Sequence, residues 1–168
     1  MKVNLKDKLE LENNKLELNK EVPNFCLATL NERTIEDVYL SDFGKKIKII
    51  SCFPSIDTGI CDLQTKRFNS TYANNEKVVV INVSCDLPFA FKKWCAANDA
   101  SNFIMLSDYR DHSFAKSFGI NVKHANLCYR SIFIVDENNK LIYSQYANAI
   151  PENLDYEEVD NFLKTILK

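Results

Sequence analysis

The sequence predicts an α/β fold in which helices flank a mixed central β-sheet. Residues 47–53 form a β-branched run of strand length, and residues 78–83 form a continuous apolar run typical of a strand buried on both faces. Apolar residues recur at helical spacing after each run, and a hairpin pattern with a terminal helix follows over 131–167. Strands that alternate with helices before an antiparallel hairpin predict a mixed sheet between helices. A length of 168 residues suits one compact domain, so residues 1–168 are expected to form a single domain.

An N-terminal β-hairpin is expected over about residues 2–20, because leucines alternate with polar residues on both sides of Asn13-Asn14. The next expected elements are a short strand over 25–30, a turn over 31–34 and a strand over 45–53 that ends at Pro54.

The second part of the chain predicts alternating helices and strands. Leu63, Phe68 and Tyr72 lie at helical spacing after Ile60, and Pro88 is suited to the first turn of a helix. The expected elements are a helix from 60 to about 74, a strand over 77–83, helices over 88–97 and 111–118, a hairpin of 131–136 with 140–146, and a helix over 157–167. This order, β-α-β-α followed by β-β-α, is that of a thioredoxin-like fold.

Composition and charge exclude several classes of protein. A net charge of -2 without a clustered basic face gives no support for nucleic-acid binding. No apolar run approaches the ~20 residues of a membrane span, and residues 1–20 lack the apolar core of a signal peptide, so no membrane partner and a cytoplasmic location are expected. Reducing pools keep cytosolic thiols open. The six cysteines therefore indicate core packing, metal binding or redox chemistry rather than a structural disulfide framework.

The segment from Pro54 to Cys61 carries the strongest chemical signal. A buried strand ends, the chain turns, and Cys61 falls in the first turn of the following helix. The unpaired N–H groups and about half a positive charge at a helix N-terminus stabilise a thiolate there. Thr58, three residues earlier, can reach the sulfur or a substrate oxygen on it. These features favour a reactive cysteine over a packing one.

Pro54, Thr58 and Cys61 reproduce the pattern Pro-x-x-x-Thr-x-x-Cys, which resembles the active-site signature of peroxiredoxins. The wider sequence is similar to the thiol peroxidase branch of that family and covers the chain from Pro23 onward. The stretches that carry the likeness are Phe53–Thr58, Arg67–Asn69, Ser84–Ala90 with Cys95 downstream, Leu106–Arg110 and Arg130–Asn138.

The resemblance implies a thioredoxin-dependent peroxidase that reduces hydrogen peroxide and alkyl or lipid hydroperoxides in antioxidant defence and redox homeostasis. Cys61 would be the peroxidatic cysteine that becomes a sulfenic acid, and Cys95 the resolving cysteine that forms a disulfide with it. Thr58 would hold the peroxide, Arg130 would stabilise the charge on the departing oxygen, and Pro54 would shield the pocket. No metal, haem or flavin is implied, because sulfur carries both electrons.

Two further expectations follow from the same likeness. The branch forms homodimers through the face around the active site. The resolving step requires residues 54–65 and 86–100 to rearrange, since cysteines bridge only when their Cα atoms lie within ~7 Å. Trp94, next to Cys95, would report that change by its fluorescence.

The other cysteines and the histidines leave some questions open. Cys26 and Cys52 are expected to pack in strands, whereas Cys85 is an alternative resolving thiol and Cys128 has no expected role beyond packing. His112 and His124 stand alone in the sequence and are expected to be solvated, since no Cys-x-x-Cys or His-x-x-x-His pair predicts a zinc site. The missing Cys-x-x-Cys disfavours a dithiol oxidoreductase. A peroxide-sensing module that acts through a partner protein remains the alternative to an enzyme.

Overall fold

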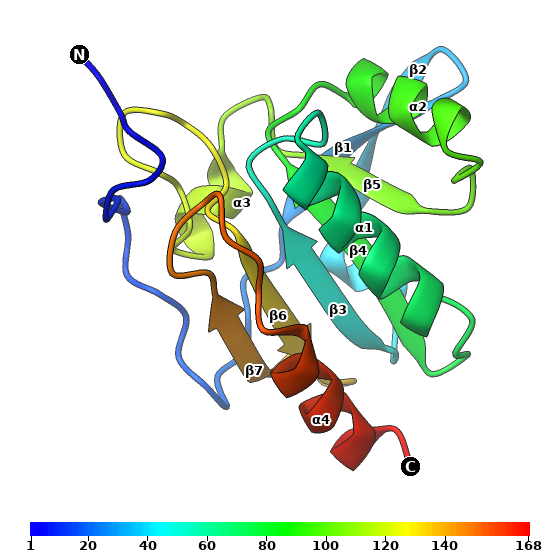
Figure 1. Cartoon of the computed structure of the whole chain (residues 1–168). Coiled ribbons are helices and arrows are strands. Elements are labelled where there is room, and N and C mark those ends of the chain that lie inside the picture. The colour runs from blue at the N-terminus through cyan, green and yellow to red at the C-terminus, as the bar shows by residue number, and fades with distance from the viewer.

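A single seven-stranded sheet forms the centre of the protein in the computed structural model, which describes residues 1–168 (Figure 1). Its strands lie in the order β2-β1-β5-β4-β3-β6-β7. Their bounds are β1 (Cys26–Asn31), β2 (Thr34–Tyr39), β3 (Ile47–Cys52), β4 (Val78–Ser84), β5 (Ile104–Ser107), β6 (Ser131–Val135) and β7 (Leu141–Tyr146).

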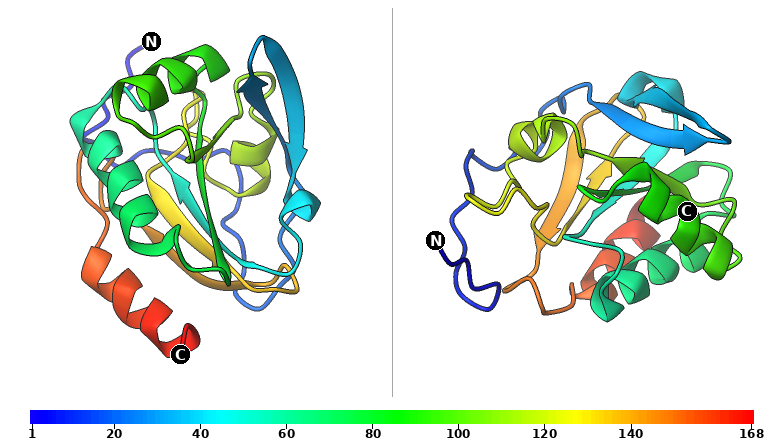
Figure 2. Two further views of the ribbon diagram at one scale, coloured as in Figure 1. Left: turned by 90° about the vertical axis from the view of Figure 1, so that its right-hand side faces the viewer. Right: turned by 90° about the horizontal axis from the view of Figure 1, so that it is seen from above.

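Helices cover both faces of this sheet. They are α1 (Gly59–Tyr72), α2 (Pro88–Ala97), α3 (Ser113–Ser117) and α4 (Tyr156–Ile166), with a 3-10 turn η1 over Leu40–Phe43. Figure 2 shows α1, α2 and α4 on one face and the short α3 on the other. The hydrophobic core is divided accordingly: Phe114 and Phe118 pack on the α3 side, and Phe68 and Leu163 pack on the α1 and α4 side. No helix has the length and apolar character required to cross a membrane.

The pairing of the central strands brings several loops to one edge of the sheet. Strands β3, β4 and β5 are parallel, so their carboxyl ends lie at the same edge. Strand β6 runs antiparallel to β3, with Ser131 opposite Cys52, so β6 begins where β3 ends. In α/β sheets, ligands bind outside the carboxyl ends of the strands. The segments that follow β3, β4 and β5 and precede β6 therefore surround the candidate site.

The mixed α/β prediction is confirmed, and α2 has the predicted bounds. Strands β2 and β5 were not predicted. Every residue of β2 is exposed or only half-buried, so it lacks the apolar alternation of a core strand, and β5 has four residues, too few to establish a period.

The predicted hairpin over residues 2–20 is wrong, and the N-terminal hairpin is instead formed by β1 and β2. Residues 1–20 run along the body as turns and extended segments. Leu11 forms an isolated bridge with Val122, and the amide of Asn19 donates to the carbonyl of Leu141. Leu16 packs against the core on the α3 side. Leu11 and Leu16 thus contact distant parts of the chain, whereas Leu18 is exposed.

Gly119 provides a test of this docked N-terminal segment. Its φ is +68°, and a Cβ there would overlap the backbone carbonyl of Asn14, whereas Gly44, with φ +58°, has open space around it. Left-handed backbone costs a residue with a Cβ about 1–2 kcal/mol, and forced overlap adds about 1–3 kcal/mol. We expect Gly119→Ala to lower the free energy of unfolding clearly more than Gly44→Ala in urea titrations. Equal losses would contradict the close contact at Asn14.

Candidate active site

Cys61 lies in the first turn of α1 with no exposed surface. Thr58 is the N-cap residue of this helix, in extended backbone conformation, and its hydroxyl oxygen accepts from the amide of Cys61 at 3.4 Å. The same hydroxyl donates to Cys61 Sγ at 2.7 Å. A threonine before a helix commonly fills this capping role. The local sequence alone therefore brings a hydroxyl to the sulfur.

Arg130 approaches the same sulfur from the start of β6. Its side chain is 1% exposed, and Nη2 lies 3.3 Å from Cys61 Sγ. The other two nitrogens donate to neutral oxygens: Nε to the carbonyl of Ile150 at 2.8 Å, and Nη1 to Oε1 of Gln64 at 2.9 Å. No carboxylate forms a salt bridge with this guanidinium. The sulfur is consequently the one group in contact with Arg130 that can carry a negative charge.

Gln64 holds the guanidinium in its orientation. It lies one turn after Cys61 on α1 and is fully buried. Its amide nitrogen donates to Ser51 Oγ at 2.8 Å and to the carbonyl of Cys52 at 3.1 Å, which leaves Oε1 directed at Arg130. The end of β3, the first turns of α1 and the start of β6 are thereby connected through one side chain.

Asp86 fixes the loop between β3 and α1. Its carboxylate accepts from Ser55 Oγ at 2.8 Å and from the amide of Ile56 at 2.7 Å, and it also accepts from the hydroxyl of Ser84. Asp86 follows the carboxyl end of β4, the strand next to β3. The neighbouring strand therefore holds the loop that carries Pro54 and Thr58.

A pocket of about 450 Å³ is lined by Thr58 and Arg130, the two residues whose side chains contact the sulfur of the fully buried Cys61. Pro54 lines the same pocket, so three of the predicted site residues meet there. Its remaining walls are largely apolar and come from Leu5, Ser55, Gly59, Ile60, Leu127, Ile150 and Pro151. A small ligand in this pocket would meet the hydroxyl of Thr58 and the guanidinium of Arg130 next to the buried sulfur.

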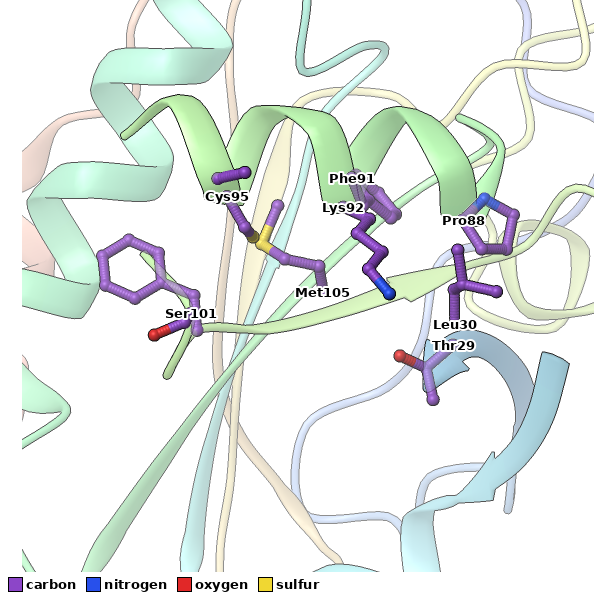
Figure 3. Close-up of a pocket in the computed structure, with 10 residues that line it drawn as sticks. Thr29, Leu30, Pro88, Phe91, Lys92, Cys95, Ser101 and Met105 are labelled. Carbon is purple, nitrogen blue, oxygen red and sulfur yellow. The ribbon is translucent and has the colours of Figure 1, made fainter. Parts of the chain in front are cut away.

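Cys95 is not part of this pocket. It lies on α2, is half-buried, and lines a second pocket of about 330 Å³ between α2, β5 and the end of β1 (Figure 3). Both Cys61 and Cys95 are free thiols, and they border the same small hydrophobic cluster around Phe91. Burial raises the pKa of Cys95. In this conformation Cys95 is therefore held as a thiol.

The sequence of the chain is similar to those of known thiol peroxidases. The AhpC/TSA family model matches residues 18–144. The chain belongs to the AhpC/TSA family. It is 40% identical over 148 residues to a thiol peroxidase of Bacillus subtilis, covering 88% of this chain and 87% of the relative. A thiol peroxidase of Streptococcus gordonii is 46% identical over 118 residues, which are 70% of this chain and 72% of the relative.

Solved structures agree with these relatives. A peroxiredoxin-like protein from Aquifex aeolicus superposes with a TM-score of 0.81 at 30% identity, covering 95% of this chain and 92% of its own. The predicted resemblance to thiol peroxidases and the thioredoxin-like fold are thereby confirmed, and the chain is an enzyme of the peroxidase type.

Sequence reasoning missed two residues of this AhpC/TSA site, Gln64 and Asp86. Gln64 is a polar residue on the buried side of α1, and Asp86 is the second residue after a buried strand, so each had a recognisable signal. The main-chain carbonyl of Ile150 carried no signal in the sequence. Cys52 is buried as expected, but the expectation that Cys26 packs in the core is wrong, because its position in β1 directs it to solvent.

The role of Gln64 can be measured with a double-mutant cycle. Hydrogen bonds to charged groups contribute about 1.5–3 kcal/mol, so Gln64→Leu in the wild-type background should cost more stability than in an Arg130→Leu background. We expect a coupling of at least about 1 kcal/mol in urea unfolding. Additive losses within about 0.5 kcal/mol would contradict the contact.

Proposed function

We propose that the protein reduces hydrogen peroxide and organic hydroperoxides through a sulfenic acid on Cys61, followed by a disulfide between Cys61 and Cys95. The observation that carries this proposal is the convergence of two donors, the hydroxyl of Thr58 and the guanidinium of Arg130, on one sulfur. The thiol peroxidases among its relatives support the same chemistry.

The first step depends on charge. A buried cation without an anionic partner is unfavourable, so Arg130 favours a thiolate at Cys61. That thiolate attacks the terminal peroxide oxygen, a sulfur–oxygen bond forms, and the oxygen–oxygen bond breaks. The negative charge then moves to the departing alkoxide or hydroxide, which takes up a proton to leave as alcohol or water. Donors fixed in place before the reaction stabilise such a developing charge.

Pro54 and the apolar walls of the pocket restrict water around the sulfur. A sulfenic acid that stays exposed to peroxide is oxidised further to sulfinic acid, which the cell reverses only in special cases. The burial of Cys61 therefore favours the slower, productive reaction with a second thiol.

The second step requires movement of α1 and α2. The indole nitrogen of Trp94 donates to Asp62 Oδ1 at 3.0 Å, and these two residues adjoin Cys95 and Cys61 in the sequence. This hydrogen bond must break when the first turn of α1 unwinds to bring the sulfurs of Cys61 and Cys95 together. Solvent exposure of Cys95 removes the burial that raises its pKa and makes it a better nucleophile. Cys95 attacks the sulfenic acid, and water is released.

The cycle closes when an external dithiol reduces the disulfide. We assign this role to thioredoxin in the cytoplasm, as the sequence resemblance to the thiol peroxidase branch implies. The exposed Phe89 and Leu87 at the start of α2 are the apolar surface nearest to Cys95 in the chain. A homodimer formed around the active-site face is part of the same proposal, with Tyr39 and Tyr109 at the edge where the site lies.

Three cysteine variants test the assigned roles. Cys61→Ser should abolish hydroperoxide reduction, because the nucleophile is lost. Cys95→Ser should consume one equivalent of peroxide and then stop in a thioredoxin-coupled NADPH assay. Cys26→Ser, an exposed thiol outside the site, is the matched control and should turn over normally. Continued turnover of Cys95→Ser would assign resolution to another thiol, and a single turnover in the wild-type protein would indicate a sensor.

Thr58 permits a finer test of the donor role. Thr58→Val keeps the shape but removes the hydroxyl, and loss of one such donor costs about 100-fold in rate. Thr58→Ser retains the hydroxyl and should stay within about threefold of wild type. Stopped-flow fluorescence of Trp94 after mixing with hydrogen peroxide measures both. Similar rates for the two variants would contradict the donor role.

A further inference from the structure

A second pair of thiols lies away from Cys61. Cys85 Sγ and Cys128 Sγ are 3.8 Å apart, although 43 residues separate them in the sequence. Cys85 follows β4 and is half-buried, whereas Cys128 precedes β6 and is fully buried. The topology explains the contact, because the carboxyl end of β4 and the start of β6 lie at the same edge of the sheet.

This pair is separate from the peroxidase site. Cys128 belongs to the hydrophobic core on the α3 side, and Cys85 packs against that core. Cys61 and Cys95 belong to the cluster on the side of α1 and α2. The structure therefore does not support Cys85 as the alternative resolving thiol for Cys61, since its sulfur contacts Cys128.

A histidine activates one of the two sulfurs. His112, expected to be solvated, is half-buried and directs Nδ1 at Cys85 Sγ across 3.2 Å. The hydrogen bond from Cys128 and the contact with His112 lower the pKa of Cys85 against the effect of its burial. The hydrogen bond to Cys85, together with burial, raises the pKa of Cys128. The pair is thus asymmetric, with Cys85 as the more acidic thiol and Cys128 as the less acidic partner.

We propose that Cys85 and Cys128 form a second redox-active dithiol, which hydroperoxides oxidise to a disulfide independently of Cys61. The Cys85 thiolate attacks the peroxide, forming a sulfur–oxygen bond and breaking the oxygen–oxygen bond. The alkoxide that leaves takes a proton from the imidazolium of His112. The Cys128 thiol then condenses with the sulfenic acid to give the disulfide and water. In total, the dithiol loses two electrons and the hydroperoxide becomes an alcohol and water.

The nearby Asp108 raises the question of a metal site. Ligand atoms of Cys85, Asp108 and Cys128 lie within 4.8 Å of one another. However, the two carboxylate oxygens of Asp108 already accept from the amides of Phe114 and Ala115, at 3.1 and 2.8 Å. The carboxylate thus caps α3, and we favour the dithiol over a metal centre.

The chain segments that carry Cys85 and Cys128 also carry residues of the peroxidase site. Cys85 immediately precedes Asp86, which holds the loop of Pro54 and Thr58, and Cys128 lies two residues before Arg130. Disulfide formation requires the sulfurs to approach from 3.8 Å to about 2.05 Å. Any backbone movement that accompanies this approach would reach Asp86 or Arg130.

The test uses the Cys61→Ser/Cys95→Ser protein, which keeps four cysteines and cannot run the peroxidase cycle. The reduced protein is treated with excess hydrogen peroxide, denatured in alkylating agent and digested with trypsin. Trypsin separates Cys85, in residues 78–92, from Cys128, in residues 124–130, and each peptide contains one cysteine. We expect a cross-link between these peptides, a fall from four free thiols to two, and full recovery with dithiothreitol. Failure of the Cys61 assignments would leave this result unchanged.

Point variants identify the mechanism. His112→Ala should slow the cross-link at least about tenfold, as loss of a proton-transfer group does, whereas the exposed His124→Ala should not. Cys128→Ala should leave a sulfenic acid at Cys85 that dimedone traps.

Four free thiols after peroxide treatment, or a cross-link to Cys26 or Cys52, would overturn the proposal. So would stoichiometric binding of added zinc chloride that Cys85→Ser abolishes, because the cluster would then be a metal site.

Discussion

The active site depends on one buried positive charge. Arg130 is almost inaccessible, forms no salt bridge with a carboxylate, and contacts two neutral oxygens and the sulfur of Cys61. Burial of an unpaired charge is unfavourable, so an anionic sulfur, as the proposed mechanism requires, would stabilise the fold and the site together. The geometry of the site follows from satisfying this guanidinium. In the proposed mechanism, stability and reactivity therefore have a common origin.

The sheet topology makes this contact possible. Parallel β3 and β4 end at one edge, and antiparallel β6 begins there, so an arginine at the start of β6 meets the first turn of the helix that follows β3. Asp86 comes from the end of β4 and holds the intervening loop. Each group in the site is located by a strand end, which restricts its freedom. A shift of β6 relative to β3 would separate Arg130 from Cys61.

Features determined by local sequence could be predicted, and those determined by distant contacts could not. The reach of Thr58 to the sulfur and the position of Cys61 in the first turn of α1 depend on residues three or fewer apart, and α2 begins at Pro88 as expected. The leucines of residues 2–20 alternate as in a hairpin, yet Leu11 and Leu16 contact remote segments, and alternation does not identify a partner. The Cys61–Arg130 contact was expected from the family resemblance. The Cys85–Cys128 contact had no such guide, because it exists only through the arrangement of β4 and β6.

The two thiol pairs differ in the groups that contact the attacking sulfur. This difference predicts that Cys61 reacts with peroxide faster than Cys85. Cys61 faces a guanidinium, a charge that stays fixed throughout the physiological pH range, together with a hydroxyl donor inside a pocket. Cys85 faces the imidazole of His112 at 3.2 Å, and neither residue lines the pocket formed by Thr58 and Arg130. In the proposed chemistry, a guanidinium and a hydroxyl donor at Cys61 stabilise the departing oxygen better than the single imidazole that faces Cys85. Peroxide at low concentration should therefore react at Cys61, and oxidation of Cys85 and Cys128 becomes important only when peroxide exceeds the capacity of the first site.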